Sequence, residues 1–387
     1  MNNEQRIMNK AVYITRLSTF FPNDPVESDD MEQYIGFVNN KSSIAKRLVL
    51  SKNGINRRYY ALDKSGNVTH TNVEMAANAV KGLLDDDFGL DQIDLLSCGT
   101  ASPEQIMPSH GVMLHGHLKG IRPMDVVSFA GSCCTGMQAL NYAYLSVLAG
   151  NAQNAVSVAS ERLSAWMSRK YFEKESELLN QLSAKPILAF EKEFLRWMLS
   201  DGAAAVLVQD KPAEKGFSYR IDWIELTSYA NEIETCMYAG GEKDAEGNLI
   251  GWTQFSETEW LEKSLFALKQ DTRILEKNII SLGSRFFREI ITKRGFDPKE
   301  VDWFLPHLSS MYFDDKLKTE IREAGYNIPD EKWFVNLPEI GNVASCSAFC
   351  MLAELAQSGK LKKGDKILFM VPESARFTYA YALITVC

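Results

Sequence analysis

Residues 125–137 read Asp-Val-Val-Ser-Phe-Ala-Gly-Ser-Cys-Cys-Thr-Gly-Met, and this stretch decides the fold. Its first six residues predict a short apolar strand, and Met137 to Leu148 has the spacing of an amphipathic helix. Cys134 therefore lies on a strand-to-helix turn, where unpaired N–H groups and the positive end of the helix dipole favour a thiolate. A nucleophilic thiol is the first hypothesis. The alternative is that Cys133 and Cys134 are two small core residues, the usual place of free cysteine.

Strand-like and helix-like runs alternate along the whole chain. The expected strands are Ala11 to Thr19, Asp94 to Thr100, Asp125 to Ala130, Ala155 to Ala159, Ala203 to Val208, Phe217 to Leu226, Trp303 to Pro306, Trp333 to Asn336, Lys366 to Val371 and Tyr379 to Val386. The expected helices are Asn72 to Leu84, Met137 to Leu148, Glu259 to Thr292, Phe313 to Ala324 and Ala344 to Ser358. This alternation predicts an α/β layered fold in two similar halves, with the break at Asp210 to Gly216.

Two segments stand outside the alternation. Leu163 to Leu199 mixes aromatic and apolar residues with charges, which predicts a helical cap over the body of the protein. Glu232 to Trp260, with Gly240, Gly241 and Gly247, predicts an irregular loop excursion. Both inserts are expected either to shape a substrate pocket or to form a subunit contact.

Composition excludes several classes of protein. The chain has 387 residues and a net charge of −8, which argues against a nucleic acid partner. The first residues lack a basic segment followed by an apolar run, and no stretch reaches the roughly 20 apolar residues of a membrane span, so we expect a cytoplasmic protein. Seven cysteines fit reduced thiols. Neither His115-Gly116-His117 nor Cys346 with Cys350 has the spacing of a zinc site, so no metal is expected.

Two further polar residues follow strand-like runs. His307 comes directly after Trp303 to Pro306, at the end of the strand where open α/β sheets place reactive groups. Asn342 follows a glycine and precedes a helix of small residues. A satisfied structural histidine and an ordinary helix cap are the alternative interpretations of these two residues.

Taken in order with Cys134, these residues resemble the thiolase superfamily, and within it the ketoacyl carrier-protein synthase III branch. The resemblance runs over nearly the whole chain. The matching motifs are Gly54-Ile55-Asn56-Arg57-Arg58 for Gly-Ile-x-x-Arg, Pro108-Ser109 for Pro-Ser, Ser132-Cys133-Cys134-Thr135-Gly136-Met137 for Ala-Ala-Cys-Ala-Gly-Phe, Ser200-Asp201-Gly202-Ala203-Ala204-Ala205 for Gly-Asp-Gly-Ala-Gly-Ala, Leu305-Pro306-His307 for Val-Pro-His, and Gly341-Asn342-Val343-Ala344-Ser345 for Gly-Asn-Thr-Ser-Ala.

The resemblance implies a thiolase-like five-layer αβαβα fold. Residues 1–210 would form the half with the nucleophile, including a cap insert at about 163–199, and residues 216–387 the half with the histidine and asparagine. Cys134 would be the nucleophile and Cys133 a packing residue. The resemblance further implies a homodimer that acts on phosphopantetheine thioesters, carried by an acyl carrier protein or coenzyme A, with no permanently bound cofactor.

The residue types suit such chemistry. A thiolate captures an acyl thioester as a new thioester of similar energy. The second substrate must become an enolate, and His307 Nε2 and Asn342 Nδ2 would donate hydrogen bonds to its oxygen. By resemblance, the tetrahedral intermediate at Cys134 uses the Cys134 N–H and an N–H of a C-terminal loop.

That loop departs from the family pattern. Residues 372–380 read Pro-Glu-Ser-Ala-Arg-Phe-Thr-Tyr-Ala where the branch has Gly-Gly-Gly-Phe-Thr-Trp-Gly. The resemblance implies Ala375 as the second oxyanion donor, and the side chains that replace the glycines restrict the backbone and crowd the site. His307 is followed by Leu-Ser-Ser in place of Gln-Ala-Asn. With the long insert, the chain most resembles ketosynthase/cyclases that form dialkylresorcinols and cyclohexanediones. An extra proton transfer would then need an acid or base: Glu161, Glu373 and Arg376 are candidates, although Glu161 is more readily explained by a pair with Arg162 or another cation.

A basic run marks the expected carrier surface. Lys41 to Arg58 contains six Lys and Arg residues and no acidic residue, on an acidic protein. Such a field attracts phosphates or an acidic carrier protein, although a solvated face is the ordinary interpretation. The motif match adds Arg57 and Arg58 as the candidate residues where pantetheine enters.

Three functions remain open at this point. The first is a condensing acyltransferase with cyclase activity. The second is an O- or N-acyltransferase on the same fold, in which Asn342 would be idle. The third is a thiolase-fold subunit without catalysis that binds a partner synthase; the presence of all three polar residues argues against it.

Overall fold

The fold is described from a computed structural model in which residues 10–40, 42–172, 195–326 and 328–387 are placed. The described strands are β1 (Tyr13–Phe20), β2 (Val26–Glu27), β3 (Arg57–Arg58), β4 (Leu95–Thr100), β5 (Asp125–Ala130), β6 (Asn154–Glu161), β7 (Gly202–Gln209), β8 (Tyr219–Ser228), β9 (Met237–Tyr238), β10 (Gly241–Lys243), β11 (Leu249–Gly251), β12 (Lys269–Gln270), β13 (Trp303–Pro306), β14 (Lys366–Glu373) and β15 (Thr378–Val386). The described α-helices are α2 (Met31–Ile35), α3 (Ile44–Asn53), α4 (Asn72–Lys81), α5 (His110–His117), α6 (Thr135–Ala149), α7 (Ser164–Met167), α10 (Glu257–Glu262), α11 (Thr272–Arg294), α12 (Asp314–Glu323), α13 (Leu337–Ile340) and α14 (Ser347–Gln357).

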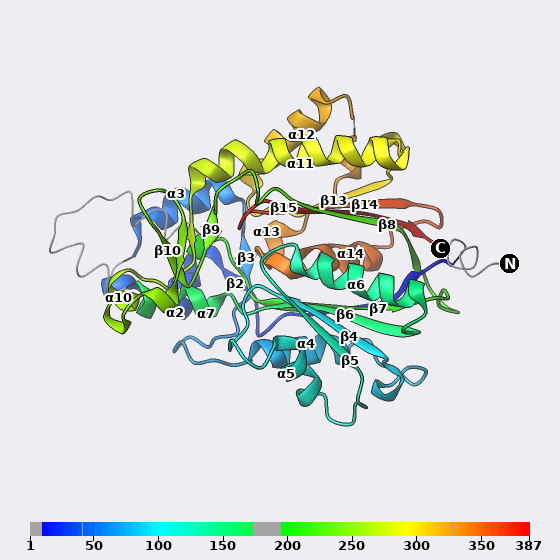
Figure 1. Cartoon of the computed structure of the whole chain (residues 1–387), viewed down its shortest axis with the longest axis horizontal. Helices are drawn as coiled ribbons and strands as arrows, with labels where there is room; N and C mark the ends of the chain where they lie inside the picture. The colour runs from blue at the N-terminus through cyan, green and yellow to red at the C-terminus, as the bar shows by residue number, and fades with distance from the viewer. Residues whose placement is uncertain (1–9, 41, 173–194, 327) are drawn as a thin grey trace.

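One nine-stranded sheet organises the molecule, in the order β13-β14-β15-β8-β1-β7-β6-β4-β5. The strands from the first 209 residues stand together at one end of this order, and those from residue 219 onward at the other. Strands β1 and β8 join the two groups through only two residue pairs, Tyr13 with Arg220 and Ile14 with Tyr219. The sheet therefore turns at this junction, and its two parts lie one above the other (Figure 1).

Helices fill the spaces around the two strand layers. Figure 1 shows α6 and α14 between the layers, α11 and α12 outside one layer, and α4 and α5 outside the other. This is the expected α/β/α/β/α layering. Helix α14 is buried along most of its length, as a helix between two sheets must be. Local signals set the helix ends: Thr71 and Glu74 form a capping box on α4, and Asp271 caps α11.

Parallel strand pairs place several chain segments at one edge of the sheet. Strand β4 runs parallel to β5 and to β6, and β13 runs parallel to β14. Because parallel strands share one carboxyl edge, the residues that follow β5 lie on the same side as those that follow β4 and β6. The residues that follow β13 and β14 share an edge for the same reason.

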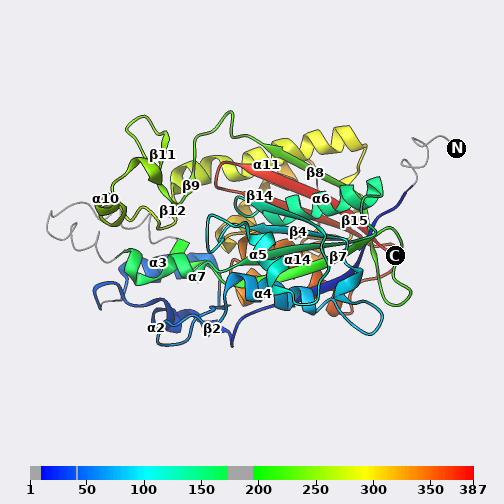
Figure 2. The ribbon, with the colours of Figure 1, turned by 60° about the horizontal axis from the view of Figure 1, so that its bottom comes forward.

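Three expectations about elements need correction. Trp333 to Asn336 is not a strand; only an isolated bridge joins Trp333 to Phe304. The helix expected over Glu259 to Thr292 is broken, because the chain leaves α10 and pairs β12 with β9 before α11 begins. The excursion at 232–260 contains a β10–β11 hairpin and α10. Strands β9 to β12 and helix α10 gather beside α3 and α7, at the end of the molecule away from the C-terminus (Figures 1 and 2).

The cap insert lies largely outside the described residues. Its beginning forms α7, and its end, Leu195–Trp197, is a short 3-10 helix with buried side chains. The buried Arg196 donates to the carbonyl oxygens of Met167 at 2.9 Å and Ile35 at 3.1 Å. Both ends of the insert are therefore fixed to the body. Within the described part of the chain, no helix has the length and apolar character needed to cross a membrane.

Candidate active site

Helix α6 begins at the carboxyl end of β5, with Cys134 as its N-cap residue at φ −77° and ψ −11°. Two glycines allow the helix to lie this close to its neighbours. A Cβ added to Gly136 would lie 2.2 Å from the Ser345 carbonyl oxygen, and one added to Gly99 would lie 2.4 Å from the Thr135 carbonyl oxygen. Any side chain at either position would push the thiol-bearing turn away from β4 and from the segment after Asn342.

A cavity of about 200 Å³ lies beside this turn. Its walls come from segments far apart in the sequence, which are the turn after β5, the two ends of the cap insert, β9, and the loops after β13 and β14. The lining residues are Ala101, Gly131, Ser132, Cys133, Leu163, Trp166, Leu195, Leu199, Met237, Tyr238, Ala239, Leu268, Gln270, Ser309, Asn342, Ala344, Ser374 and Ala375. The candidate residues Asn342 and Ala375 thus share one mostly apolar chamber with the turn after β5.

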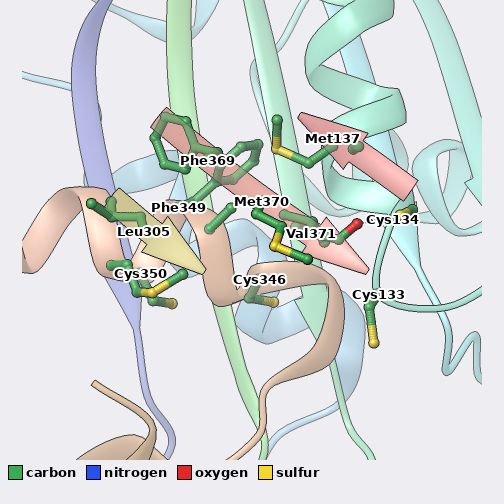
Figure 3. Close-up of a cluster of buried hydrophobic side chains, with 14 of the residues drawn as sticks. Cys133, Cys134, Met137, Leu305, Cys346, Phe349, Cys350, Phe369, Met370 and Val371 are labelled. Atoms are coloured by element: carbon green, nitrogen blue, oxygen red, sulfur yellow. Dashed lines mark hydrogen bonds between the residues drawn. The ribbon is translucent and has the colours of Figure 1, made fainter. Parts of the chain in front are cut away.

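The two adjacent cysteines face different surroundings. Cys133 lines the cavity and is 7% exposed, whereas Cys134 is fully buried. The Cys134 thiol contacts the carbonyl oxygens of Val371 at 3.1 Å and Thr378 at 3.5 Å. In Figure 3 the Cys133 side chain points away from the cluster around Met370 and Val371. Burial raises the pKa of Cys133 to about 12 and that of Cys134 well above its ordinary value, so both are thiols at rest.

His307 is buried directly after β13, with its backbone N–H bonded to the Met370 carbonyl oxygen at 2.8 Å. Within the described residues its Nε2 has no hydrogen-bond partner. Burial lowers its pKa to about 4, so the imidazole is neutral at pH 7. His307 lines a smaller pocket with Asn336 and Gly341, and it is not among the residues that line the cavity with Asn342.

Asn342 is held from both sides of its peptide. Its backbone N–H donates to the Met198 carbonyl oxygen at 3.0 Å, and its own carbonyl oxygen accepts from Ser200 N–H at 2.9 Å. The side-chain Oδ1 accepts from Ala344 N–H at 2.9 Å. The side chain lines the cavity, and its Nδ2 amide is its hydrogen-bond donor.

Glu161 ends β6 and is fully buried, and no cation among the described residues pairs with it. Its carboxylate accepts from the hydroxyls of Ser102 at 2.6 Å and Ser345 at 2.5 Å, and from Ala101 N–H at 2.9 Å. Arg162 pairs instead with Glu104 at 2.9 Å, so the expected Glu161–Arg162 pair is not present. Burial raises the pKa of Glu161 to about 7. The carboxylate ties the Ser345 segment to the loop after β4.

Glu373, at the end of β14, is hydrogen-bonded to the thiol-bearing turn. Its Oε2 accepts from Ser132 N–H at 3.2 Å and from Cys134 N–H at 3.1 Å. The side chain is buried, and burial raises the pKa of this carboxyl. The sequence offers it only as one acid/base candidate among several, because its contact with Cys134 depends on two segments 239 positions apart.

The C-terminal loop lies against the β9 segment. The Ala375 carbonyl oxygen accepts from Cys236 N–H at 2.9 Å and Met237 N–H at 3.2 Å. Ala375 itself lines the cavity, as its candidate role requires. Arg376 is bonded to the Ile233 carbonyl oxygen through Nε at 3.3 Å and is exposed, so it lies outside the chamber.

The two candidate arginines for pantetheine lie in different surroundings. Arg57 is exposed and pairs with Glu339 at 2.7 Å. Arg58 is fully buried, where it donates to the Ser28 hydroxyl at 3.0 Å. Burial lowers the pKa of Arg58. Arg58 therefore presents no surface to a phosphate in this structure, and of the pair only Arg57 can reach one.

A second hollow of about 180 Å³ lies between α3 and the start of α11. Lys52 and Glu276 stand on its rim, and Met198 and Ser310 form part of its wall. Leu199 and Ser309, their neighbours in the chain, line the cavity beside the cysteine turn. The same two chain segments thus separate the hollow from the chamber. Among the described residues, no cluster of three or more His, Cys, Asp or Glu side chains could hold a metal.

Comparison with known proteins places this geometry in context. Residues 291–385, which include His307, Asn342 and Ala375, match the family model for the 3-oxoacyl-[acyl-carrier-protein] synthase III C terminal. The β-ketoacyl-[acyl-carrier-protein] synthase III of Aquifex aeolicus is 23% identical over 359 residues, covering 90% of this chain and 91% of that protein. The Clostridium perfringens synthase is 24% identical, covering 94% and 96%.

Solved structures agree with the sequence matches. The Aquifex aeolicus synthase III superposes with a TM-score of 0.69 at 21% identity, covering 97% of this chain and 99% of that chain. A variant of Xanthomonas campestris OleA superposes with a TM-score of 0.75 at 19% identity, covering 97% and 98%. AbyA1, a tetronic acid condensing enzyme, superposes with a TM-score of 0.72 at 17% identity, covering 97% and 99%. The chain therefore has the thiolase-like fold of these enzymes.

Proposed function

We propose that the chain is a condensing acyltransferase. It captures an acyl thioester on Cys134 and joins the acyl group to a β-ketoacyl or malonyl thioester through a new carbon–carbon bond. The observation that carries this proposal is the shared chamber, in which the turn bearing the two cysteines and the Asn342 carboxamide meet from segments about 200 residues apart. The similarity to synthase III enzymes over 90% of the chain supports it.

The first half-reaction is thioester exchange. The Cys134 thiol gives up its proton, and the sulfur attacks the acyl carbonyl carbon of the donor. Collapse of the tetrahedral intermediate breaks the bond to the donor sulfur, and the carrier leaves as a free thiol. Cys134 must first turn from the Val371 carbonyl oxygen toward the chamber, a rotation about χ1. The Cys134 N–H, and that of Ala375, are the proposed donors to the oxyanion.

The second half-reaction needs an enolate. It forms either by loss of carbon dioxide from a malonyl group or by loss of a proton between the two carbonyls of a β-ketoacyl group. A neutral imidazole at His307 and the Nδ2 amide of Asn342 are suited to donate hydrogen bonds to the enolate oxygen. The enolate carbon then attacks the acyl group on Cys134, and the cysteine thiol is regenerated.

We further propose a ring closure after this step, toward a cyclohexanedione or resorcinol precursor. The support is chemical. A second carbon–carbon bond requires an additional proton transfer, and the site has two buried carboxyls, Glu161 and Glu373. AbyA1, which shares the fold, is a tetronic acid condensing enzyme, so a ring-forming reaction is compatible with this architecture.

The hollow beside Lys52 is the proposed path for a phosphopantetheine arm from coenzyme A or an acyl carrier protein. It opens between α3 and α11, and its inner wall adjoins the chamber at Met198 and Ser310. Exposed Arg47 and Arg57 and the Lys52 side chain stand in the basic run around it. We propose no resident cofactor.

The proposed site lies between two halves of the chain. We assign the cysteines to a half spanning residues 1–210 and the histidine and asparagine to a half spanning residues 216–387. The sheet order supports this division, because strands from the two ranges stand on opposite sides of the β1–β8 junction. We also propose that the active form is a homodimer.

Intact-mass spectrometry tests the proposed function. The protein is incubated with acyl-coenzyme A and, separately, with acyl carrier protein bearing the same chain. We expect a mass increase equal to one acyl group, which is absent in Cys134→Ala and still present in Cys133→Ala. Absence of an adduct with every donor would contradict the acyl-transfer chemistry. An adduct that disappears only in Cys133→Ala would instead assign the nucleophile to the cavity-lining thiol.

A further inference from the structure

The carboxylate of Glu373 is fixed beside the two cysteines by the turn that carries them. Only 7% of the residue is exposed, and one oxygen, Oε2, accepts both the Ser132 N–H at 3.2 Å and the Cys134 N–H at 3.1 Å. Thr378, directly opposite Glu373 in the β14–β15 pair, donates its hydroxyl to the same carboxylate. Glu373 therefore touches the residue that the proposed function makes the nucleophile.

This carboxylate is surrounded by hydrogen-bond donors and forms no ion pair among the described residues. The groups that act on it are two N–H donors and the Thr378 hydroxyl, and no Lys, Arg or His of the described residues forms an ion pair with it. Its negative charge adds to burial in raising the pKa of the Cys133 and Cys134 thiols, and Glu161 acts on Cys133 in the same direction. Loss of a thiol proton to solvent would thus place a second negative charge in a buried site.

The histidine is poorly placed to take that proton. Among the described residues, the imidazole Nε2 of His307 makes no hydrogen bond, and burial lowers its pKa to about 4. The two sulfurs are hydrogen-bonded to the Val371 and Thr378 carbonyl oxygens and the Ser132 hydroxyl, and the Ala380 backbone also bonds to Cys134. Neither sulfur is therefore bonded to a nitrogen base.

We propose that Glu373 accepts the thiol proton of Cys134 during acyl loading and returns it to the departing carrier thiol. This inference rests on the proposed function. The proton moves from sulfur to the carboxylate oxygen, so the buried site keeps a single negative charge throughout. The thiolate then attacks the thioester carbonyl, the bond to the carrier sulfur breaks, and the Glu373 carboxylic acid protonates the leaving thiolate. No oxidant, reductant or further reactant is needed.

The same proton transfer frees the oxyanion donors. While Glu373 is ionised, its Oε2 occupies the N–H groups of Ser132 and Cys134. A protonated carboxyl is a weaker acceptor than a carboxylate. Formation of the thiolate therefore releases these N–H groups when an oxyanion is about to form beside them.

The test compares wild type with Glu373→Gln, which keeps the size of the side chain and a carbonyl oxygen for the two N–H groups. Acyl-adduct formation is followed by rapid-quench intact mass between about pH 6 and 9. We expect loading at pH 7 to slow by about 100-fold or more, the usual effect of losing a general base. The deficit should shrink as pH rises, because solvent then removes the thiol proton.

A second measurement uses no acyl donor. Iodoacetamide alkylation of the peptide that contains Cys133 and Cys134 is followed over the same pH range in protein whose fold is verified by circular dichroism. Removal of the negative charge lowers the thiol pKa, so Glu373→Gln should be alkylated faster than wild type at neutral pH. Loading and alkylation then change in opposite directions, which a purely structural role for Glu373 does not produce.

Glu225→Gln is the matched control. Glu225 is a mostly buried carboxyl on β8 that pairs with Lys293 and Arg294 and makes no hydrogen bond to α6. Its replacement removes the same charge and should leave both rates as in wild type. If Glu373→Gln does not fold, Glu373→Asp is measured, with slower loading expected because the shorter acid sits farther from the sulfur. Wild-type loading at every pH in the folded variant, or slower alkylation, overturns the proposal. A wild-type protein that accepts no acyl group contradicts the proposed function instead, and the alkylation comparison still tests the effect of Glu373.

Discussion

Asn342 shows how single hydrogen bonds determine which atom of a residue can act. Its Oδ1 is bonded to Ala344 N–H, and the Nδ2 amide is the hydrogen-bond donor of this cavity-lining side chain. We expect Asn342→Ala to lower the rate of carbon–carbon bond formation by about 100-fold or more, since loss of one oxyanion donor typically costs about 3 kcal/mol. Acyl loading on the cysteine should persist. Product analysis by mass spectrometry and intact-mass measurement separate the two steps.

The same variant distinguishes the alternative function. In an O- or N-acyltransferase no enolate forms, so Asn342→Ala would leave product formation intact. A variant that retains wild-type condensation would therefore contradict the role proposed for the carboxamide. Ser309→Ala, another cavity-lining change, serves as the comparison for a general disturbance of the chamber.

The sequence predicts the positions of the site residues better than their orientations. The motifs mark the turn after β5 and the loop with Asn342, and the structure places both segments on one cavity. They do not reveal that the Cys134 thiol points to Val371, because this rotamer depends on a strand more than 230 residues away. Arg58 is similar: the local charge pattern indicates a surface, whereas contacts with Ser28 bury it.

At the scale of elements, Glu161 joins the end of β6 to the loop after β4 and the segment before α14. Burial raises its pKa from 4.5 to about 7. Between these pH values the native carboxyl keeps its proton while the unfolded one loses it, so the free energy of unfolding falls as pH rises. We expect a loss of about 3 kcal/mol across this window from Glu161. Glu161→Gln should flatten that slope in denaturant titrations.

Asp201 should also make the free energy of unfolding fall as pH rises. Its buried carboxylate accepts hydrogen bonds from the Ala61 N–H, the Ser164 N–H and the Ser164 hydroxyl. Burial raises its pKa from 3.8 to about 6. In Glu161→Gln the free energy of unfolding should therefore still fall as pH rises toward about pH 6, but less steeply than in wild type. Asp201→Asn should remove this remaining decline. An unchanged slope in Glu161→Gln would show that this carboxyl is ionised in the native state throughout the range.

The local sequence pattern predicts the boundaries of some short strands correctly. Strands β5 and β13 begin and end where the sequence predicts, because their runs are short and bounded by charged residues or by the site loops. The prediction fails where tertiary pairing overrides periodicity. The helical pattern over 259–292 is interrupted because Lys269 and Gln270 pair with β9. No local signal indicates that pairing.

At the scale of the whole molecule, strand β5 ends the nine-stranded sheet and pairs on one side only, with β4. Its residues are partly exposed, whereas β4 is fully buried. The loop before α5 adds the apolar Ile106 and Met107, which are 76% and 82% exposed. An open strand edge with apolar neighbours invites pairing with another chain. A two-fold axis beside β5 would pair it with its own copy, which is the homodimer that we propose.

We expect sedimentation to give about twice the 43.6 kDa mass of one chain. The double variant Ile106→Glu with Met107→Glu should shift the protein toward a monomer, because it places charges on exposed apolar residues of the loop before α5 that pack little against their own chain. Leu261→Glu, at an apolar position of α10 that is 60% exposed, should leave the mass unchanged. A monomeric wild type would contradict the proposed homodimer. A dimer that persists in the double variant would place the contact elsewhere. If the double variant is a monomer, its melting temperature relative to wild type reports how much pairing with the second copy stabilises the β5 edge.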